Sequence, residues 1–166
     1  MSTRSVIAVM HEGTPRGRYV HSDGYPSWMG HALVRLVNRD GLDTVRRVLT
    51  QDWFAWSSIN PDEPRSSEPD DSPPRSSGTS VQFLRDVHVK GYGTAFHRAD
   101  YPDEWWMPGQ DSEAEWFYLL HDDYLQVYVD HGAELWPVGQ PMSWDLPVEL
   151  LAATLAASES AGEARS

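Results

Sequence analysis

Cysteine is absent from the sequence, which excludes several ways of holding a small fold together. Disulfide bonds, thiolate zinc sites, iron–sulfur clusters and a cysteine nucleophile all require it. Stability must therefore come from an apolar core. Of the 166 residues, 40% are hydrophobic and eight are tryptophans. Each tryptophan buries roughly 150–250 Å², so a few of them would supply much of the core of one domain.

The hydrophobic pattern predicts an α+β fold. We expect an antiparallel sheet with an N-terminal β-hairpin, helices packed on one face, and a C-terminal hairpin and helix. Strands are predicted over 5–10, 18–21, 87–96 (with a bend), 115–120, 124–129 and 133–138, and helices over 28–38, 44–49 and 148–157.

Composition sets the expected boundaries of the folded part. Residues 60–79 are mostly proline, serine and acidic residues without an apolar side chain, which predicts a flexible insertion. Residues 158–166 are small and polar, which predicts a disordered tail. We therefore expect a single α+β domain over residues 1–157.

The negative charge is concentrated in the last part of the chain. The net charge is −12, and residues 99–164 contain 14 acidic residues and no lysine or arginine. Residues 1–98 are nearly neutral, with 12 basic and 11 acidic residues. Such a surface repels nucleic acid and attracts a protein partner with a basic surface, although acidic residues also simply promote solubility.

The sequence predicts no contact with a membrane. No apolar stretch approaches the roughly 18 residues of a membrane span. The first ten residues include no long apolar segment of the kind that directs export. We therefore expect a cytoplasmic protein.

One loop is the first candidate site. His21, Asp23 and Tyr25 follow a predicted strand and precede a helix, and could form a pocket with His97, Arg98 and Asp100. Asp23 could instead cap the helix while Tyr25 packs against the core. No metal-binding spacing occurs, so we expect no metal and no cofactor.

Adjacent tryptophans are the second candidate. Trp105 and Trp106 cannot easily both be buried on one face of a strand, so they could form a binding platform. Three later tryptophans, Trp116, Trp136 and Trp144, could extend this platform or could belong to the core.

Two segments resemble a known group of proteins. The start Thr3-Arg4-Ser5 and the box Tyr19-Val20-His21-Ser22-Asp23-Gly24-Tyr25-Pro26 resemble a family of small uncharacterised phage and prophage proteins. The run Glu115-Trp116-Phe117-Tyr118-Leu119 is similar to a later hairpin of that family. The family has no established activity, so the resemblance implies an accessory protein and no enzyme class.

These observations lead to a binding function as the main hypothesis. We expect a phage-type accessory protein that binds a host or defence macromolecule through an acidic, tryptophan-rich surface. A small enzyme or ligand-binding protein with a pocket near residues 21–26 is the alternative, and a virion component is a third. No nucleophile or phosphate-binding motif identifies catalytic residues, so an enzyme is the less favoured class.

Overall fold

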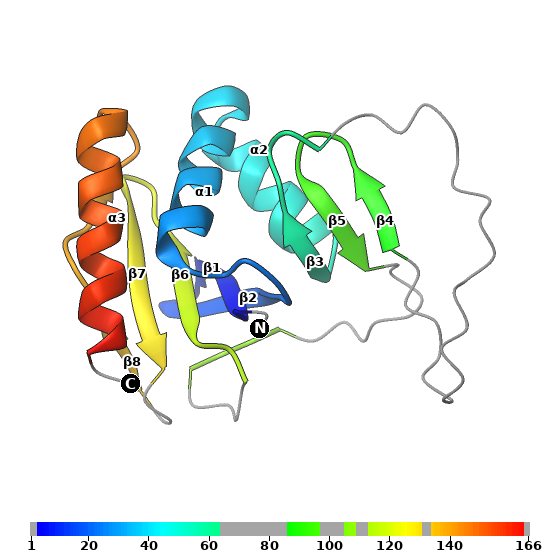
Figure 1. The fold of residues 1–166 in the computed structure, drawn as a ribbon. Helices are drawn as coiled ribbons and strands as arrows, with labels where there is room; N and C mark the ends of the chain where they lie inside the picture. Colours follow the sequence, from blue (N-terminus) through cyan, green and yellow to red (C-terminus); the bar gives the residue numbers. More distant parts are fainter. Residues whose placement is uncertain (1–2, 64–85, 97–104, 109–112, 131–133, 165–166) are drawn as a thin grey trace.

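The structure is a computed structural model that describes residues 3–63, 86–96, 105–108, 113–130 and 134–164. Its helices pack against a β-sheet (Figure 1). In chain order the elements are β1 (Ser5–His11), β2 (Thr14–Val20), α1 (Pro26–Asp40), α2 (Leu42–Arg47), a π-helical turn η1 (Val48–Asp52), β3 (Ala55–Ile59), β4 (Asp86–Val89), β5 (Gly93–Phe96), β6 (Trp116–Leu120), β7 (Tyr124–Asp130), β8 (Leu135–Pro137), β9 (Met142–Ser143) and α3 (Val148–Glu163).

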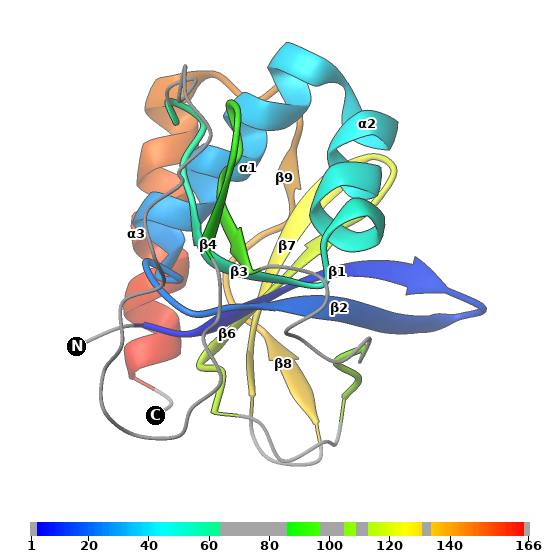
Figure 2. The ribbon, with the colours of Figure 1, turned by 90° about the vertical axis from the view of Figure 1, so that its right-hand side faces the viewer.

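Strands of the described residues form one twisted, mixed sheet. Its order is β4-β5-β3-β2-β1-β6-β7-β8, and the short β9 also pairs with β7. The hairpins β1–β2, β4–β5 and β6–β7 are antiparallel. The β1–β2 hairpin projects from the body of the molecule and turns at Glu12 and Gly13, which both have positive φ (Figure 2). Such a pair of φ angles is the signature of a tight two-residue hairpin turn.

Strand β1 lies at the centre of the sheet and is buried on both faces. It pairs with β6 in parallel, from Ser5 opposite Trp116 to Ala8 opposite Leu119. Ile7 faces the main core, whereas Val6 and Ala8 face a smaller cluster on the other side. A strand covered on both faces needs a continuous apolar run, and residues 6–9 provide one.

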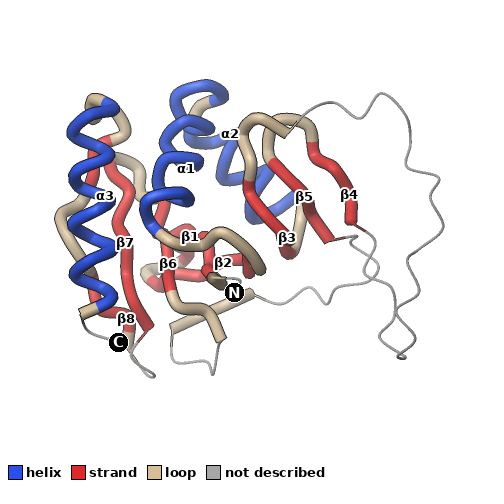
Figure 3. The backbone as a smooth tube through the Cα atoms, in the orientation of Figure 1, coloured by secondary structure: helices blue, strands red, loops and turns tan. Residues whose placement is uncertain are grey.

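All three helices contribute to the main core on one face of the sheet (Figure 3). Helices α1 and α3 pack side by side because Gly30 leaves room for the Leu155 side chain. Apolar positions spaced three and four residues apart, as at Met29, Leu33 and Leu36, bury the inner side of α1.

Helix α3 runs beyond the predicted end at Ala157. Ser158 and Gly162 are buried, in register with Leu151 and Leu155 on the inner side. A Cβ atom on Gly162 would lie 2.3 Å from the Trp116 ring, so the last turn is packed against the core. Residues 158–163 are therefore helical, and the predicted disordered tail is wrong for them.

A polar network attaches the outer strands to α1. The Arg39 guanidinium donates to the backbone carbonyls of Pro61 (3.0 Å) and Gly91 (2.9 Å) and to the Asp40 carboxylate. The Tyr92 hydroxyl donates to the same carboxylate at 2.6 Å. Hydrogen bonds from Arg39 and Tyr92 hold the pKa of Asp40 below its usual value. Burial, followed by the Asp40 carboxylate, raises the pKa of Tyr92 to about 12.

Arginine also holds the turn at residues 60–63, where the predicted insertion begins. Arg35 donates to both Asp62 oxygens, at 2.9 and 2.7 Å. These hydrogen bonds lower the pKa of Asp62 and raise the pKa of Arg35. The remainder of the insertion, residues 64–79, lies outside the described residues.

The α+β class, the N-terminal hairpin and the C-terminal helix are confirmed. The sheet is mixed and not purely antiparallel, because β1 pairs in parallel with β6 and β2 pairs in parallel with β3. The bent strand predicted over 87–96 is the β4–β5 hairpin, which turns at Gly91 with a φ of 73°. No helix of the described residues is long and apolar enough to span a bilayer.

The packing of α3 generates the first prediction. Gly162→Ala should lower the free energy of unfolding by about 1–2 kcal/mol, because overpacking against Trp116 outweighs the gain in helix propensity. Ser160→Ala, on the exposed side of the same turn, should be neutral or slightly stabilising. Denaturant titrations measure both. A stabilised Gly162→Ala protein would show that this turn does not pack against the core.

The hydrogen bond between Tyr92 and Asp40 leads to the second prediction. Tyr92→Phe should cost about 1 kcal/mol at neutral pH, the usual net value of one hydrogen bond. Because the folded pKa of Tyr92 is raised from 10 to about 12, its contribution is complete below pH 10 and is lost as the pH rises to 12. The stability of the wild-type protein should therefore fall toward that of Tyr92→Phe in this window. Parallel pH profiles of the two proteins would contradict the prediction.

Candidate functional site

The loop that carries His21, Asp23 and Tyr25 is tied to the sheet. The His21 amide donates to the Trp56 carbonyl (2.9 Å), and its Nδ1 lies 3.0 Å from the Tyr19 hydroxyl oxygen. The buried Tyr118 hydroxyl donates to the Gly24 carbonyl at 2.5 Å, and burial raises the pKa of Tyr118. The backbone of this loop is therefore held in place.

Side chains of this loop do not take the capping role considered above. Asp23 is exposed with a φ of 57°, and Tyr25, which occupies the N-cap position of α1, makes no side-chain capping hydrogen bond. The Glu159 carboxylate of α3 instead accepts from the Ser27 amide in the first turn at 2.9 Å. Tyr25 is 37% exposed and does not pack into the core. Pro26 begins the helix, as its fixed φ favours.

The other half of this candidate pocket consists of His97, Arg98 and Asp100, which lie outside the described residues. Its assembly with His21 remains a prediction. Among the described residues, no group of three or more metal-ligating side chains is found.

Trp105 and Trp106 lie on opposite faces of the sheet. Trp106 exchanges two backbone hydrogen bonds of 2.8 Å with Gly17 of β2, so this short segment extends the sheet beside β2. The Trp106 ring packs near Tyr19 and the smaller hydrophobic cluster. Trp105 is placed on the helix side by the alternation of side chains. They are partly buried and do not form one exposed platform.

Trp105 instead stacks with arginine. The Arg18 guanidinium carbon lies 3.5 Å from the Trp105 ring centroid and 4.6 Å from that of Phe54, and the Arg16 guanidinium carbon lies 4.0 Å from Trp105. Arg18 is only 2% exposed, and its Nε donates to the Thr50 carbonyl at 2.9 Å. Guanidinium groups stack on aromatic faces better than ammonium groups do. The cluster anchors β2 to the turn η1.

The π-helical turn supplies acceptors for this cluster. The wider turn of η1 leaves the carbonyls of Leu49 and Thr50 to accept from side chains, namely the Trp56 indole (3.0 Å) and Arg18. Single π-helical turns often occur at functional sites. Here the turn has an evident structural role.

The later tryptophans divide between core and surface. Trp116 and Trp144 are buried in the main core, and the Trp144 indole donates to the His121 carbonyl at 2.9 Å. Trp136 is 41% exposed, and its indole donates to Glu134 at 3.3 Å. Of the tryptophans proposed as a platform, Trp136 alone is more than a third exposed, so the predicted tryptophan-rich surface is reduced to one indole.

Some of the C-terminal acidic residues pair with arginines of the N-terminal half. Arg4 binds Glu113, and Arg46 binds Asp122 at 2.9 Å. The charge asymmetry of the sequence is therefore partly neutralised in the fold. Other acidic side chains remain exposed around α3 and β8, among them Glu134, Asp145 and Glu149.

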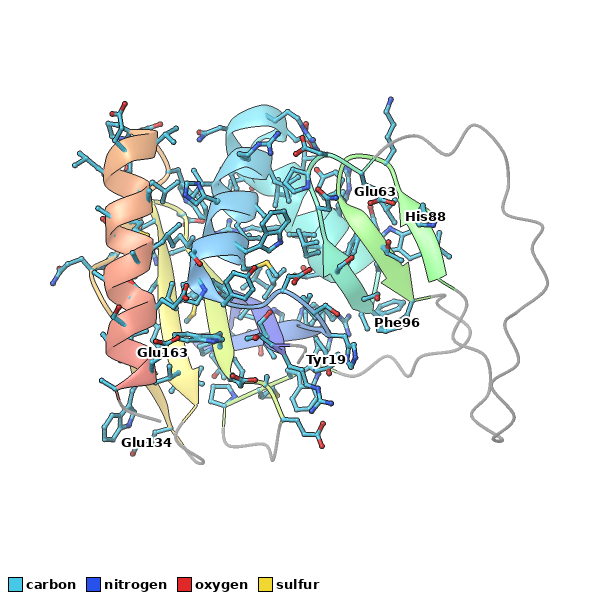
Figure 4. All side chains as sticks on the ribbon, viewed as in Figure 1. Tyr19, Glu63, His88, Phe96, Glu134 and Glu163 are labelled. Carbon is cyan, nitrogen blue, oxygen red and sulfur yellow. The ribbon has the colours of Figure 1, made fainter. Side chains whose placement is uncertain are left out.

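Exposed apolar and acidic side chains are distributed along one side of the molecule, from the first to the last turn of α3. Trp136 is paired with Val129, whose side chain faces Gly162, so Trp136 lies beside the last turn of α3. Gly139, in the loop after β8, lies against Ser158. Glu134 and Glu163 are seen at this end of α3 in Figure 4. We define the α3–β8 surface by Glu134, Trp136, Glu149, Leu150, Ala153, Ala156 and Ala157.

Sequence reasoning missed most of this surface. Leu150 is a large apolar residue of the last helix, yet it is 56% exposed, and Val148 is 70% exposed. The buried side of α3 is identified by Ser158 and Gly162, which continue the spacing of Leu151 and Leu155. They are small, so a search for large apolar residues overlooks them.

Another titratable pair lies beside β4 and β5. Glu63 Oε1 is 2.5 Å from His88 Nδ1, and the Thr94 hydroxyl lies 3.4 Å from the same nitrogen (Figure 4). A catalytic triad requires the hydroxyl at the opposite ring nitrogen, Nε2. The arrangement of Glu63, His88 and Thr94 is therefore a hydrogen-bonded surface cluster and not a triad.

Comparisons with protein-family models, with curated proteins and with solved structures each returned no match. The resemblance to phage proteins stays a prediction, and the function is argued from the residues alone.

The buried arginine generates the third prediction. Arg18→Lys removes the donor to Thr50 and the planar group between Phe54 and Trp105, so it should lower the free energy of unfolding by about 2–3 kcal/mol. Arg16→Lys, which changes the less buried cation on the same indole, should cost less than about 1 kcal/mol. Urea titrations that give equal losses would contradict the assignment of Arg18 as the anchor.

Proposed function

We propose that the protein acts by binding a protein partner with a basic surface, and that the α3–β8 surface is the contact. The observation that carries this proposal is the combination of exposed apolar and acidic side chains there. Trp136 is 41% exposed and lies beside Glu134 at the last turn of α3, and Leu150 is 56% exposed and follows Glu149 in the first turn. No lysine or arginine occurs from residue 99 to residue 164.

The two kinds of side chain have separate roles in such a contact. An exposed indole is among the side chains that most often dominate binding energy, because it buries a large area with few rotatable bonds. Carboxylates around it accelerate encounter with a basic partner and repel nucleic acid. Trp136 would be the anchor, and Glu134 and Glu149 would steer the partner.

The resemblance of the N-terminal segments to phage and prophage proteins extends the proposal to the origin of the partner. An accessory protein of that kind would bind a host or defence protein.

Pull-down from bacterial lysate at low and moderate salt tests the proposal. The wild-type protein should retain basic proteins, and the combined variant Trp136→Ala, Glu134→Gln and Glu149→Gln should retain at least about tenfold less, the effect expected on losing one hot spot. Glu12→Gln with Asp123→Asn removes two exposed acidic charges elsewhere and should retain wild-type amounts. Equal losses in the two variants, or nothing retained above bare resin, would contradict the proposal.

A further inference from the structure

The outward side of α3 is apolar and flat at its centre. Ala153, Ala156 and Ala157 are exposed there, and the larger Leu150 and Val148 are exposed toward the start of the helix. The Leu151–Leu155 side faces the core, so the outward side has no partner among the described residues. Leu150 is 56% exposed and precedes Ala153 by three residues and Ala157 by seven, so these three side chains adjoin on the helix surface. A contiguous exposed apolar patch marks a contact surface.

The shape of this side matches another helix. Helix axes pack about 8–10 Å apart, and the shortest distances require small side chains at the crossing point. Alanines at 153, 156 and 157 are spaced as one ridge of a helix surface, and no side chain there projects beyond a Cβ atom. The 16 residues of α3 span about 24 Å, the length of four turns. This is enough for an amphipathic helix to lie along it.

The charges around the outward side of α3 determine which kind of partner helix could bind there. Helix α3 carries no cation, and its Glu149 and Glu163 are exposed. Glu159 faces α1, where its carboxylate accepts from the Ser27 amide at 2.9 Å. Asp145 precedes α3, and Glu134 lies beside its last turn. A second copy of α3 would place carboxylates near carboxylates. A partner with lysine or arginine on both sides of an apolar stripe would place cations near them.

We propose that the outward side of α3 docks an amphipathic helix whose apolar stripe is flanked by lysine or arginine. This rests on the proposed function and specifies its partner. Ala153 and Ala157 form the contact floor, Leu150 and Trp136 border it, and Glu149 meets the flanking cations.

Two synthetic peptides of identical composition serve as probes. Both have about 18 residues, mostly leucine and lysine; one has leucine at i, i+3, i+4 and i+7, and the other has the same residues shuffled so that no stripe forms. Their binding is measured by isothermal titration calorimetry near physiological salt, and the helicity of the peptide by circular dichroism. The patterned peptide should bind at least about tenfold tighter and become helical on binding.

Ala153→Glu separates helix packing from charge. The substitution blocks close approach of a helix but adds a negative charge. If helices pack, it should lower the affinity for the patterned peptide about tenfold. If only charge acts, it should raise that affinity. Ala157→Glu should repeat the result, and Asn38→Glu, an exposed site on α1, should leave the affinity unchanged. Thermal unfolding checks that each variant is folded.

Three outcomes overturn the inference in distinguishable ways. If both peptides bind with equal affinity and Ala153→Glu raises that affinity, helix docking is excluded and the proposed function is left intact. Absence of binding by either peptide would overturn helix docking, and the pull-down would then decide the proposed function separately. A concentration-dependent dimer that Ala153→Glu dissociates would assign the outward side of α3 to a second copy of the chain.

Discussion

The parallel pairing of β1 with β6 is the interaction on which the rest of the structure depends. It brings Ser5–Ala8 beside Trp116–Leu119, two segments separated by most of the chain, and it joins the N-terminal hairpin to the C-terminal one. Both strands are buried on both faces in this region. Strands with two covered faces contribute apolar burial on each side, so this pair forms the centre of both hydrophobic clusters.

Helix α3 takes its position from this pairing. Gly162 packs against Trp116 at the start of β6, and Leu155 packs against Gly30 of α1. These contacts fix the inner side of α3. An α-helix that is bound on one side presents the opposite side as a rigid surface. The small outward residues and the neighbouring carboxylates are therefore held in a constant geometry, which reduces the entropy cost of binding a partner.

Local patterns predicted much of the fold, and long-range contacts explain what they could not predict. Alternating and helical spacings identified the hairpins and helices, because these depend on neighbours within a few residues. The parallel β1–β6 and β2–β3 pairs join distant segments, and no local pattern specifies them. Arg18 in a buried stack with Trp105 was unpredictable for the same reason. Of the candidate site, the acidic bias was visible in the sequence, but the exposure of Leu150 and burial of Trp116 and Trp144 required the tertiary structure.

Native-state amide hydrogen exchange tests the central claim most directly: that α3 is a fully folded helix fixed to the β1–β6 centre. The account predicts that inner-side amides of α3 through Gly162 exchange only in a large-scale unfolding event, as do the central amides of β1 and β6. Exchange of residues 158–163 at the rates of an unfolded chain, while β1 and β6 stay protected, would contradict it. The C-terminal half of the proposed contact surface would then not exist in the folded protein.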